Sequence, residues 1–253
     1  MTSRRAWLRT WLGAGLALVA RAAGAQPRGG TVRADPAHRA EVDVPILADD
    51  PIAIPLTVSV DHPMEADHFI RSLDVVLATD PVPGKGTFLF TPASGRASVA
   101  FQMRSGQGGD LVVAVECTRH GRFETRRAVR VAPGGCALPP GAAAKESGGS
   151  PTLRLAGGAK PGAIVPVWAS LKHTSHTGLT ERQGKFVPER APYYVERVTV
   201  LVGDEQVSEF RLTPAVSPDP RIRFFVRAAP GKAIRVAFIN NRGERWEASQ
   251  PQG

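Results

Sequence analysis

Val131-Ala132-Pro133-Gly134-Gly135-Cys136 is the stretch around which the 253-residue chain is organised. A run typical of a β-strand ends here in two glycines and a cysteine, and sequence rich in Pro, Gly and Ala follows. Hydrophobic periodicity is lost at this point, which predicts a domain boundary, and the chain is long enough for two ordinary domains. We therefore expect a β-rich domain on either side of a linker.

Residues 26–136 show short strands separated by turns. From Ile52 to Val60 apolar side chains occupy every second position, which is typical of a strand with one buried face. Pro55 confines this strand to an edge or to a position whose amide is not paired. Further strands are expected at 70–78, 87–90, 96–103, 111–118 and 123–131, after a loose polar segment over 26–41. Short strands at this spacing, without a helical period, predict an antiparallel β-sandwich.

Residues 137–150 contain two prolines, three successive alanines and a Ser-Gly-Gly-Ser run, so we expect a flexible linker. Strand patterning resumes over residues 151–253. The expected strands lie at 152–155, 164–171, 194–202, 206–212, 221–227, 232–239 and 245–249, with a hairpin turn at 240–243. The predicted fold class is therefore all-β, with two antiparallel β-sandwich domains in tandem joined by a flexible linker.

Residues 1–25 have the features of a targeting segment. Arg4 and Arg5 precede an apolar run over residues 11–20, and small residues at 23–25 suit a signal peptidase. The paired arginines look like a twin-arginine (Tat) signal. We expect a mature chain that starts near Gln26, in the periplasm and without a membrane anchor. An uncleaved anchor is the alternative, which the shortness of the apolar run disfavours.

The formal charge of +9 depends partly on the targeting segment. Its four arginines leave on cleavage, which lowers the charge of the mature chain to +5. The remaining basic residues are scattered among acidic ones, without a basic stripe or interleaved aromatics, so a nucleic-acid partner is not expected. An anionic partner stays possible because a modest positive field can steer encounters.

The chain has two cysteines, Cys117 and Cys136. Cys117 is in phase with the apolar residues of its strand and is expected to be an inert core thiol. An oxidising compartment favours a disulfide, but the intervening hairpin strand should hold the two Cα atoms beyond the roughly 7 Å that a disulfide allows. Cys136 has only small neighbours, so we expect an exposed thiol, and the strand that leads to it carries Arg126, Arg127 and Arg130, which could favour a thiolate. A passive loop cysteine is the alternative.

Motifs for catalysis and metal binding are weak or missing. His173 and His176 lie three residues apart, and His62 and His68 lie six apart, but a tight metal site needs several ligands at definite spacing. We interpret these histidines as solvated loop residues and expect neither a metal nor a cofactor. The sequence has no Gly-x-Ser-x-Gly elbow, no phosphate loop and no His-Glu-x-x-His motif. The protein is therefore not expected to be an enzyme.

Three motifs of the first half resemble SoxY, the sulfur-carrier subunit of the bacterial thiosulfate-oxidising system. They are Thr57 to Asp61 with His62-Pro63-Met64, the run Phe90-Thr91-Pro92-Ala93-Ser94-Gly95-Arg96-Ala97, and Gly134-Gly135-Cys136. The resemblance implies an immunoglobulin-like sandwich with a swinging arm. In it Gly134 and Gly135 form the arm, and Cys136 is the residue that covalently carries sulfur intermediates between partner enzymes.

The half from residue 151 onward resembles SoxZ, which forms a heterodimer with SoxY. The resembling stretches are residues 158–162, 171–178, 183–188 and 220–227. The two resemblances imply a natural fusion, of the kind grouped with quinoprotein dehydrogenases. One departure stands out: the separate carrier holds its cysteine on a free Gly-Gly-Cys-Gly-Gly tail, whereas Cys136 is followed by Ala137-Leu138-Pro139-Pro140 and is tethered on both sides.

The leading hypothesis is a non-enzymatic periplasmic carrier that holds a sulfur-containing or other thiol-reactive group on Cys136. The implied partners are periplasmic redox or sulfur-transferring enzymes, with a quinoprotein dehydrogenase as one candidate. Two alternatives stay open. One is an assembly module that docks to such a dehydrogenase without using the cysteine, and the other is a structural protein stapled by a disulfide.

Overall fold

The structure, a computed structural model, describes residues 35–132, 134–137, 145–156 and 160–252. The predicted signal peptide at 1–25 and the expected start at Gln26 lie outside these residues, as does most of the predicted linker, 138–144. No helix in the described part of the chain is both long enough and apolar enough to cross a membrane.

The described residues form β-strands and two short 3-10 helices. The first half contains η1 (Pro36–His38), β1 (Ala40–Asp43), β2 (Leu47–Ala48), β3 (Ile54–Val60), β4 (Ile70–Leu77), β5 (Gly84–Phe90), η2 (Pro92–Ser94), β6 (Ala97–Met103), β7 (Gly109–Cys117) and β8 (Gly121–Val131). The second half contains β9 (Gly148–Leu155), β10 (Ile164–His173), β11 (Leu179–Arg182), β12 (Lys185–Pro188), β13 (Val195–Val202), β14 (Glu205–Leu212), β15 (Arg221–Arg227), β16 (Ala233–Asn240) and β17 (Arg245–Pro251). The all-β prediction is confirmed.

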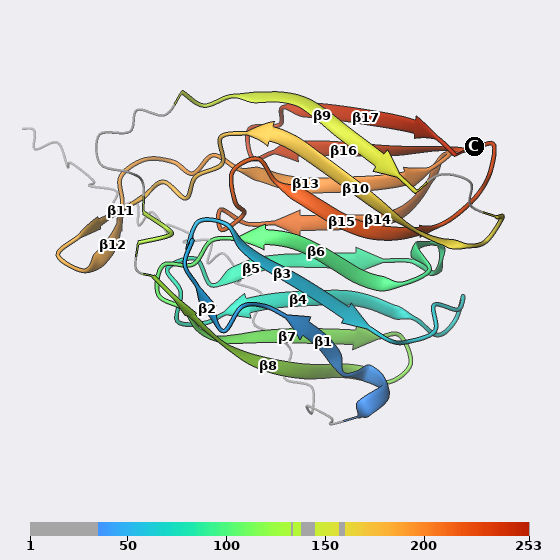
Figure 1. Cartoon of the computed structure of the whole chain (residues 1–253), viewed down its shortest axis with the longest axis horizontal. Helices are drawn as coiled ribbons and strands as arrows, with labels where there is room; N and C mark the ends of the chain where they lie inside the picture. The colour runs from blue at the N-terminus through green and yellow to red at the C-terminus, as the bar shows by residue number, and fades with distance from the viewer. Residues whose placement is uncertain (1–34, 133, 138–144, 157–159, 253) are drawn as a thin grey trace, which may run out of the picture.

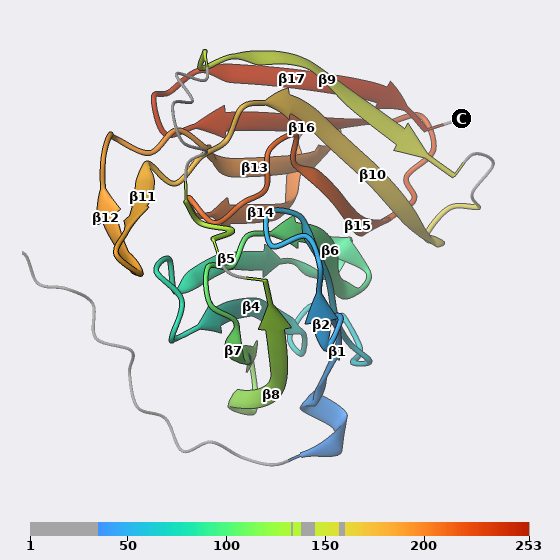
Figure 2. The ribbon, with the colours of Figure 1, turned by 60° about the vertical axis from the view of Figure 1, so that its left-hand side comes forward.

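Apart from β11 and β12, which pair as a two-stranded sheet of their own, the strands of both halves belong to the same two sheets (Figure 1). One sheet has nine strands in the order β17-β16-β13-β14-β5-β4-β7-β8-β2, and the other has six in the order β1-β3-β6-β15-β10-β9. The halves meet where β5 pairs with β14, from Phe90 opposite Ser208 to Gly86 opposite Leu212. The sandwiches are therefore joined by hydrogen-bonded strands, in addition to the predicted linker, as the turned view also shows (Figure 2).

A single hydrophobic core runs across the junction. On β3 the predicted alternation is realised, since Ile54, Leu56, Val58 and Val60 are buried and Pro55 is exposed. Aromatic rings continue the core from one half to the other. Their centroids lie 4.8 Å apart for Phe88 and Phe101, 5.7 Å for Phe88 and Phe210, and 5.4 Å for Phe210 and Phe224. Offset and edge contacts at such distances add to the stabilisation from burial.

β8 connects the two ends of the first half. It starts after the β7–β8 turn, near η1, and finishes at the Gly-Gly-Cys stretch beside the second half. Eleven residues of antiparallel strand span roughly 35 Å at a rise of about 3.4 Å each. Strand β9 begins at Gly148, so the last three residues of the predicted linker, 148–150, belong to a strand.

Candidate functional site

The Gly-Gly-Cys arm lies docked against the loops that follow β4 and β6. The amide of Ala137 donates to the carbonyl of Gly134 over 2.9 Å, which closes a tight turn around the cysteine. Gly134 has φ of 97°, a backbone conformation that favours glycine. At Gly135 a Cβ atom would overlap the carbonyl oxygens of Ser105 and Pro51, so only glycine fits this slot.

The Cys136 thiol is buried and has no exposed surface, which corrects the expectation of an exposed sulfur. Its Sγ donates to Oδ1 of Asp80 over 3.3 Å. Burial, together with the negative charge of Asp80, raises the pKa of the Cys136 thiol to about 12. In this position the group is a protonated thiol at neutral pH, and its nucleophilicity is low because the thiolate is the reactive form.

Asp80 belongs to a buried charged network around the thiol. Lys85, which is fully buried, lies 2.9 Å from Oδ1 of Asp80 and also donates to the carbonyls of Val82 and Arg104. Although burial acts in the opposite direction, Lys85 and Ser105 hold the pKa of Asp80 below its usual value. The ion pair therefore fixes a carboxylate next to the cysteine, and a buried pair of this kind is costly to break.

The cations that act on Cys136 are not the arginines of the strand that leads to it. Arg126, Arg127 and Arg130 are exposed along β8. Lys85 and Arg104 instead lower the pKa of Cys136, against the stronger effects of burial and Asp80. Sequence reasoning missed both residues because they come from β5 and from the end of β6, and only the fold brings them to the arm.

The second half covers the docked arm. The hydroxyl of Thr177 donates to the carbonyl of Cys136, and Ala137 forms a parallel bridge with Leu179 at the start of β11. Arg104 from the first half donates to the carbonyl of Ser175 over 2.5 Å. The cysteine thus sits at the seam between the halves. Within the described residues both cysteines are free, which confirms the doubt about a disulfide.

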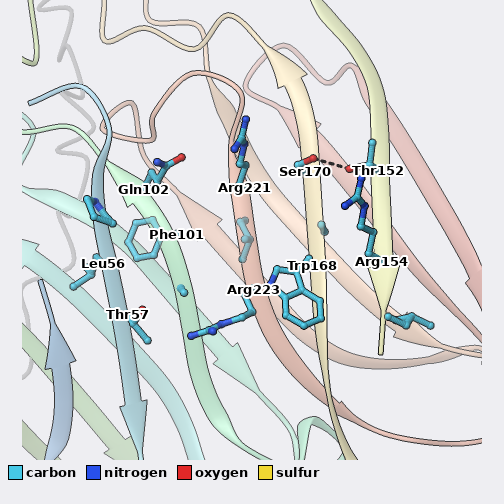
Figure 3. A pocket seen from close by; sticks show the side chains of 15 residues that line it. Leu56, Thr57, Phe101, Gln102, Thr152, Arg154, Trp168, Ser170, Arg221 and Arg223 are labelled. Carbon is cyan, nitrogen blue, oxygen red and sulfur yellow. Dashed lines mark hydrogen bonds between the residues drawn. The ribbon is translucent and has the colours of Figure 1, made fainter. Parts of the chain in front are cut away.

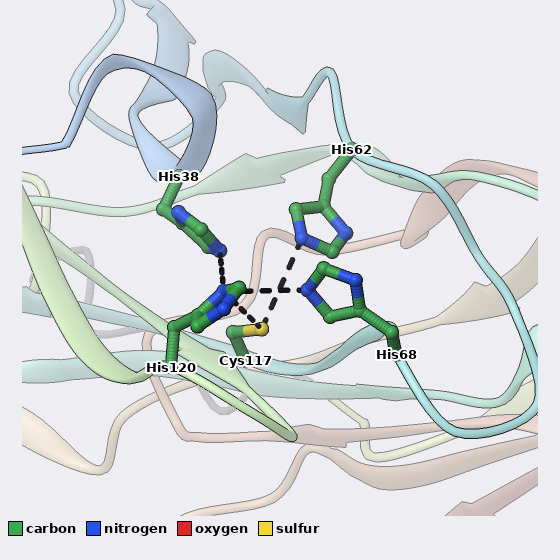
Figure 4. A group of neighbouring side chains, drawn as sticks. All are labelled: His38, His62, His68, Cys117 and His120. Atoms are coloured by element: carbon green, nitrogen blue, oxygen red, sulfur yellow. Dashed lines mark hydrogen bonds between the residues drawn. The ribbon is translucent and has the colours of Figure 1, made fainter.

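A second cluster lies at the opposite end of β8 (Figure 4). It consists of one ligand-type atom each from His38, His62, His68, Cys117 and His120, all within 4.8 Å of one another. His38 ends η1, and Cys117 ends β7 and is buried as predicted. The expectation of solvated histidines is wrong for three of the four residues it named, because His62, His173 and His176 are buried, and His38 is buried as well.

The four imidazole rings of this cluster form a closed square. Neighbouring ring centroids are 4.8 Å apart for His38 and His62, 4.5 Å for His62 and His68, 4.8 Å for His68 and His120, and 4.8 Å for His120 and His38. The diagonal from His38 to His68 measures 6.4 Å. The Sγ atom of Cys117 lies 3.9 Å from Nε2 of His62 and 3.8 Å from Nδ1 of His120. Because these two rings stand at opposite corners, the sulfur lies near the axis of the square.

Hydrogen bonds at the back of two rings orient them. Nδ1 of His38 contacts Oδ2 of Asp35 at 2.9 Å, and Nδ1 of His62 contacts the carbonyl of Pro63 at 2.6 Å. Both acceptors hold a proton on Nδ1, so each ring turns an unprotonated Nε2 toward the centre of the square. Burial lowers the pKa of His62, and positive charge on His38, His68 or His120 would lower it further, which favours neutral rings.

Comparison with known proteins identifies the two halves. The family described as sulfur oxidation protein SoxY matches residues 29–136, and the family described as sulphur oxidation protein SoxZ matches residues 153–251. The chain is a fused SoxY–SoxZ-like protein. The SoxY match of this fusion ends at Cys136, and the SoxZ match begins within β9. The chain thus belongs to the SoxY and SoxZ families of sulfur oxidation proteins.

Solved structures resemble parts of the fusion. The sulfur carrier protein SoxY from Chlorobium limicola f thiosulfatophilum is 21% identical, with a TM-score of 0.31 over 37% of this chain and 78% of that one. Superoxide reductase (neelaredoxin) from Ignicoccus hospitalis, in its E23A form, is 25% identical, with a TM-score of 0.36 over 38% and 82%. A putative superoxide reductase from Thermotoga maritima is 19% identical, with a TM-score of 0.33 over 38% and 87%. No curated protein matches the chain.

The fusion also has an open hollow of about 990 Å³ on the outer face of its six-stranded sheet (Figure 3). It spans the junction of the halves, from β3 and β6 to β15, β10 and β9. Arg154, Arg221 and Arg223 line it beside the exposed Trp168. Neither Cys136 nor any residue of the histidine cluster lines this hollow.

Proposed function

We propose that the fusion is a non-enzymatic periplasmic carrier that holds a sulfur-containing or other thiol-reactive group on Cys136 and presents it to partner enzymes. The observation that carries the proposal is the tandem of SoxY and SoxZ domains, with the SoxY match ending at the cysteine of the Gly-Gly-Cys arm. The partners are periplasmic redox or sulfur-transferring enzymes, with a quinoprotein dehydrogenase as one candidate.

The carrier works by alternating between docked and released arm positions. In the docked position the thiol is buried and protonated, which protects it from adventitious oxidation. Release requires the loss of the contacts of Cys136 with Asp80 and Thr177. Gly134, whose added Cβ would meet only Glu181 Oε2 at 3.9 Å, is suited to be the hinge.

Loading then follows the chemistry of thiol exchange. Released Cys136 loses its proton to solvent, and its thiolate attacks the outer sulfur of a partner's persulfide. A sulfur–sulfur bond forms at Cys136, and the partner's thiolate leaves with the electron pair of the broken bond. The step needs no further oxidant, and its reverse delivers the sulfur atom.

Intact-mass spectrometry of the mature chain tests this function. After incubation with a persulfidated donor protein, wild type is expected to gain the mass of one sulfur atom, and peptide mapping should place it on Cys136. Cys136→Ser should gain none, while Cys117→Ser should load normally. Loading that persists in Cys136→Ser, or full activity of this variant in a reconstituted sulfur-oxidising system, would contradict the proposal.

The second candidate is a docking module that does not use its cysteine. The burial of Cys136 and its raised pKa favour this reading, because a thiol that never leaves its slot remains unreactive. The same comparison decides between the two functions. A docking module would bind its partner equally well in wild type and in Cys136→Ser, and neither protein would acquire an adduct.

Periplasmic export forms part of the proposal. The twin arginines at positions 4 and 5 and the small residues at 23–25 support it. An Arg4→Lys, Arg5→Lys double variant is expected to accumulate inside the cell with its N-terminus intact, whereas wild type is expected in the periplasmic fraction, cleaved near Gln26. Equal periplasmic amounts of both proteins would speak against a Tat route.

A further inference from the structure

We propose that His38, His62, His68 and His120 bind one first-row transition-metal ion at the centre of their square, with the Cys117 thiolate as the fifth, axial ligand. This site is separate from the carrier site of Cys136. The two lie at opposite ends of β8, which spans roughly 35 Å. The inference stands whether or not Cys136 carries sulfur.

The spacing of the donor atoms fits an ion at the centre. Metal–nitrogen bonds of about 2.1 Å place neighbouring nitrogens of a square site about 3 Å apart. Nε2 of His38 lies 2.9 Å from Nδ1 of His120, which in turn lies 3.3 Å from Nε2 of His68. Ligand atoms at these separations need only small movements to reach bonding distance.

Ring protons alone do not provide hydrogen bonds for all the nitrogens that face the centre of the square. His38 and His62 donate their Nδ1 protons to Asp35 and to the Pro63 carbonyl, so their inward nitrogens act as acceptors while the rings are neutral. Additional protons would place like charges on rings whose centroids are less than 5 Å apart, which is unfavourable. A single metal cation can accept all the inward lone pairs without placing positive charges on neighbouring rings.

The donor set defines the class of metal. Four imidazoles and a thiolate suit iron, cobalt, nickel, copper or zinc, whereas magnesium and calcium require oxygen ligands. Structural zinc sites are almost always tetrahedral with four ligands, so a square of four nitrogens with a fifth, axial sulfur favours an ion that accepts tetragonal geometry. The apical position opposite the sulfur is not taken by any of these five ligands. His120 is exposed and His68 is half-buried, so solvent and small anions have access to this region.

Hydrogen bonds and a ring contact behind the ligands indicate a site that is built and not accidental. Metal-ligating histidines typically donate their other ring nitrogen to a carboxylate or a backbone carbonyl, as His38 and His62 do here. The ring of Phe123 stacks on His38 with centroids 4.3 Å apart and planes 11° apart, which further fixes that ring. The ligands come from η1, from the segment between β3 and β4, and from the end of β7 with the turn that follows it, so the ion would hold three separate segments together.

The test is a metal titration of the mature chain, purified without a polyhistidine tag and stripped with a chelator. Cobalt(II) serves as the probe because a thiolate ligand gives it a charge-transfer absorption band. We expect one equivalent to bind, with the band present, and the thermal midpoint to rise because the ion binds only the folded chain. Elemental analysis of untreated protein then identifies the natural ion, and azide should perturb the spectrum by occupying the apical position.

The two cysteines supply a matched pair of variants. Cys117→Ser should abolish the charge-transfer band, whereas Cys136→Ser should leave both the band and the stoichiometry unchanged. His120→Asn, at an exposed turn and therefore tolerant of substitution, should weaken affinity at least tenfold while its circular dichroism matches that of wild type.

Three outcomes would overturn the site. The first is a folded wild type that takes up no cobalt, zinc, iron or copper. The second is a band that survives in Cys117→Ser, and the third is an affinity that His120→Asn leaves unaltered. In any of these cases the five side chains form only a hydrogen-bonded histidine cluster.

Discussion

At Gly135 a hydrogen atom in place of a side chain lets the arm lie between Pro51 and the Ser105 carbonyl. This close approach brings the neighbouring sulfur to Asp80 and keeps the thiol protonated. Steric fit at one residue therefore controls the reactivity of the next. The sequence shows the glycine pair but not this reason for it, because the slot is made by loops more than twenty residues away.

Gly135→Ala should release the arm. The added Cβ would force the arm out of its slot at a cost typical of overpacking, about 1–3 kcal/mol, so we expect thiol reagents to label Cys136 roughly 10- to 100-fold faster. The measurement is the labelling rate of Cys136, assigned by peptide mapping to distinguish it from Cys117. Gly162→Ala is the control, because at φ of 78° it adds backbone strain while its Cβ meets no atom within 4 Å, and it should label as slowly as wild type. Equal rates for Gly135→Ala and wild type would show that the arm is not held by this slot.

His173 should make the fold sensitive to mild acid. It is 1% exposed, stacks on Tyr193 and contacts Ser175 Oγ, and burial lowers its pKa from 6.5 to about 4, although Glu244 and Asp219 act in the opposite direction. The unfolded chain takes up the proton first, so the stabilisation is complete above pH 6.5 and is lost as the pH falls toward 4. At about 1.4 kcal/mol per pH unit this amounts to roughly 3 kcal/mol.

Urea unfolding at several pH values between 7 and 4 measures this loss. Neighbouring His176 also has a lowered pKa, so wild type should be compared with His173→Gln, which cannot take up the proton. The variant is expected to be less stable at pH 7 and to have a shallower dependence on pH. Parallel curves for the two proteins would assign the acid sensitivity to other groups.

At the scale of elements, strand β8 and the β5–β14 pair determine where the two sites lie and how the halves are joined. β8 sets the distance between the arm and the histidine cluster, and the β5–β14 pairing joins the halves. Phe210 on β14 is fully buried and packs against Phe88 and Phe90 of β5. This aromatic contact couples the packing of one half to that of the other.

Phe210→Ala should therefore destabilise both halves together, by about 3–5 kcal/mol. Among the described residues tryptophan occurs only in the second half, at 168 and 246, while Cys117 and Cys136 lie in the first. Tryptophan fluorescence and thiol exposure thus report on different halves, and both should shift to the same lower urea midpoint. Phe225→Ala, on the outward and half-exposed side of β15, is the control and should cost less. Separate midpoints for the two probes would mean that the halves unfold independently.

Strands were predictable where their side chains alternate. Ile54 to Val60 and the core strands that follow it carry a period of two, and each appears close to its expected position. β1 and β11 were not predictable, because residues such as Glu41 and Glu181 give them little apolar character and pairing alone defines them. Cys136 could also be singled out from the sequence, because the Gly-Gly-Cys motif consists of consecutive residues.

The histidine cluster shows the limit of reading a chain by local spacing. His38 and His120 are 82 residues apart in sequence, yet their ring nitrogens lie 2.9 Å apart. Of the two pairs that spacing singles out, His62 and His68 belong to the cluster, whereas His173 and His176 lie in a different region, against Tyr193. A signal did exist: several histidines fall just outside strand ends, where the turns of one end of a sandwich gather.

At the scale of the whole molecule, the two halves share both sheets and one core, so neither presents the open edge that a separate subunit would. A joint that two free chains would form by collision is here formed within one chain, at an effective concentration that dilution does not change. Every molecule therefore contains one Gly-Gly-Cys arm and one second half that covers it. Regulation by subunit exchange is closed to this molecule, and any control over the thiol must act on a few loop contacts at the seam.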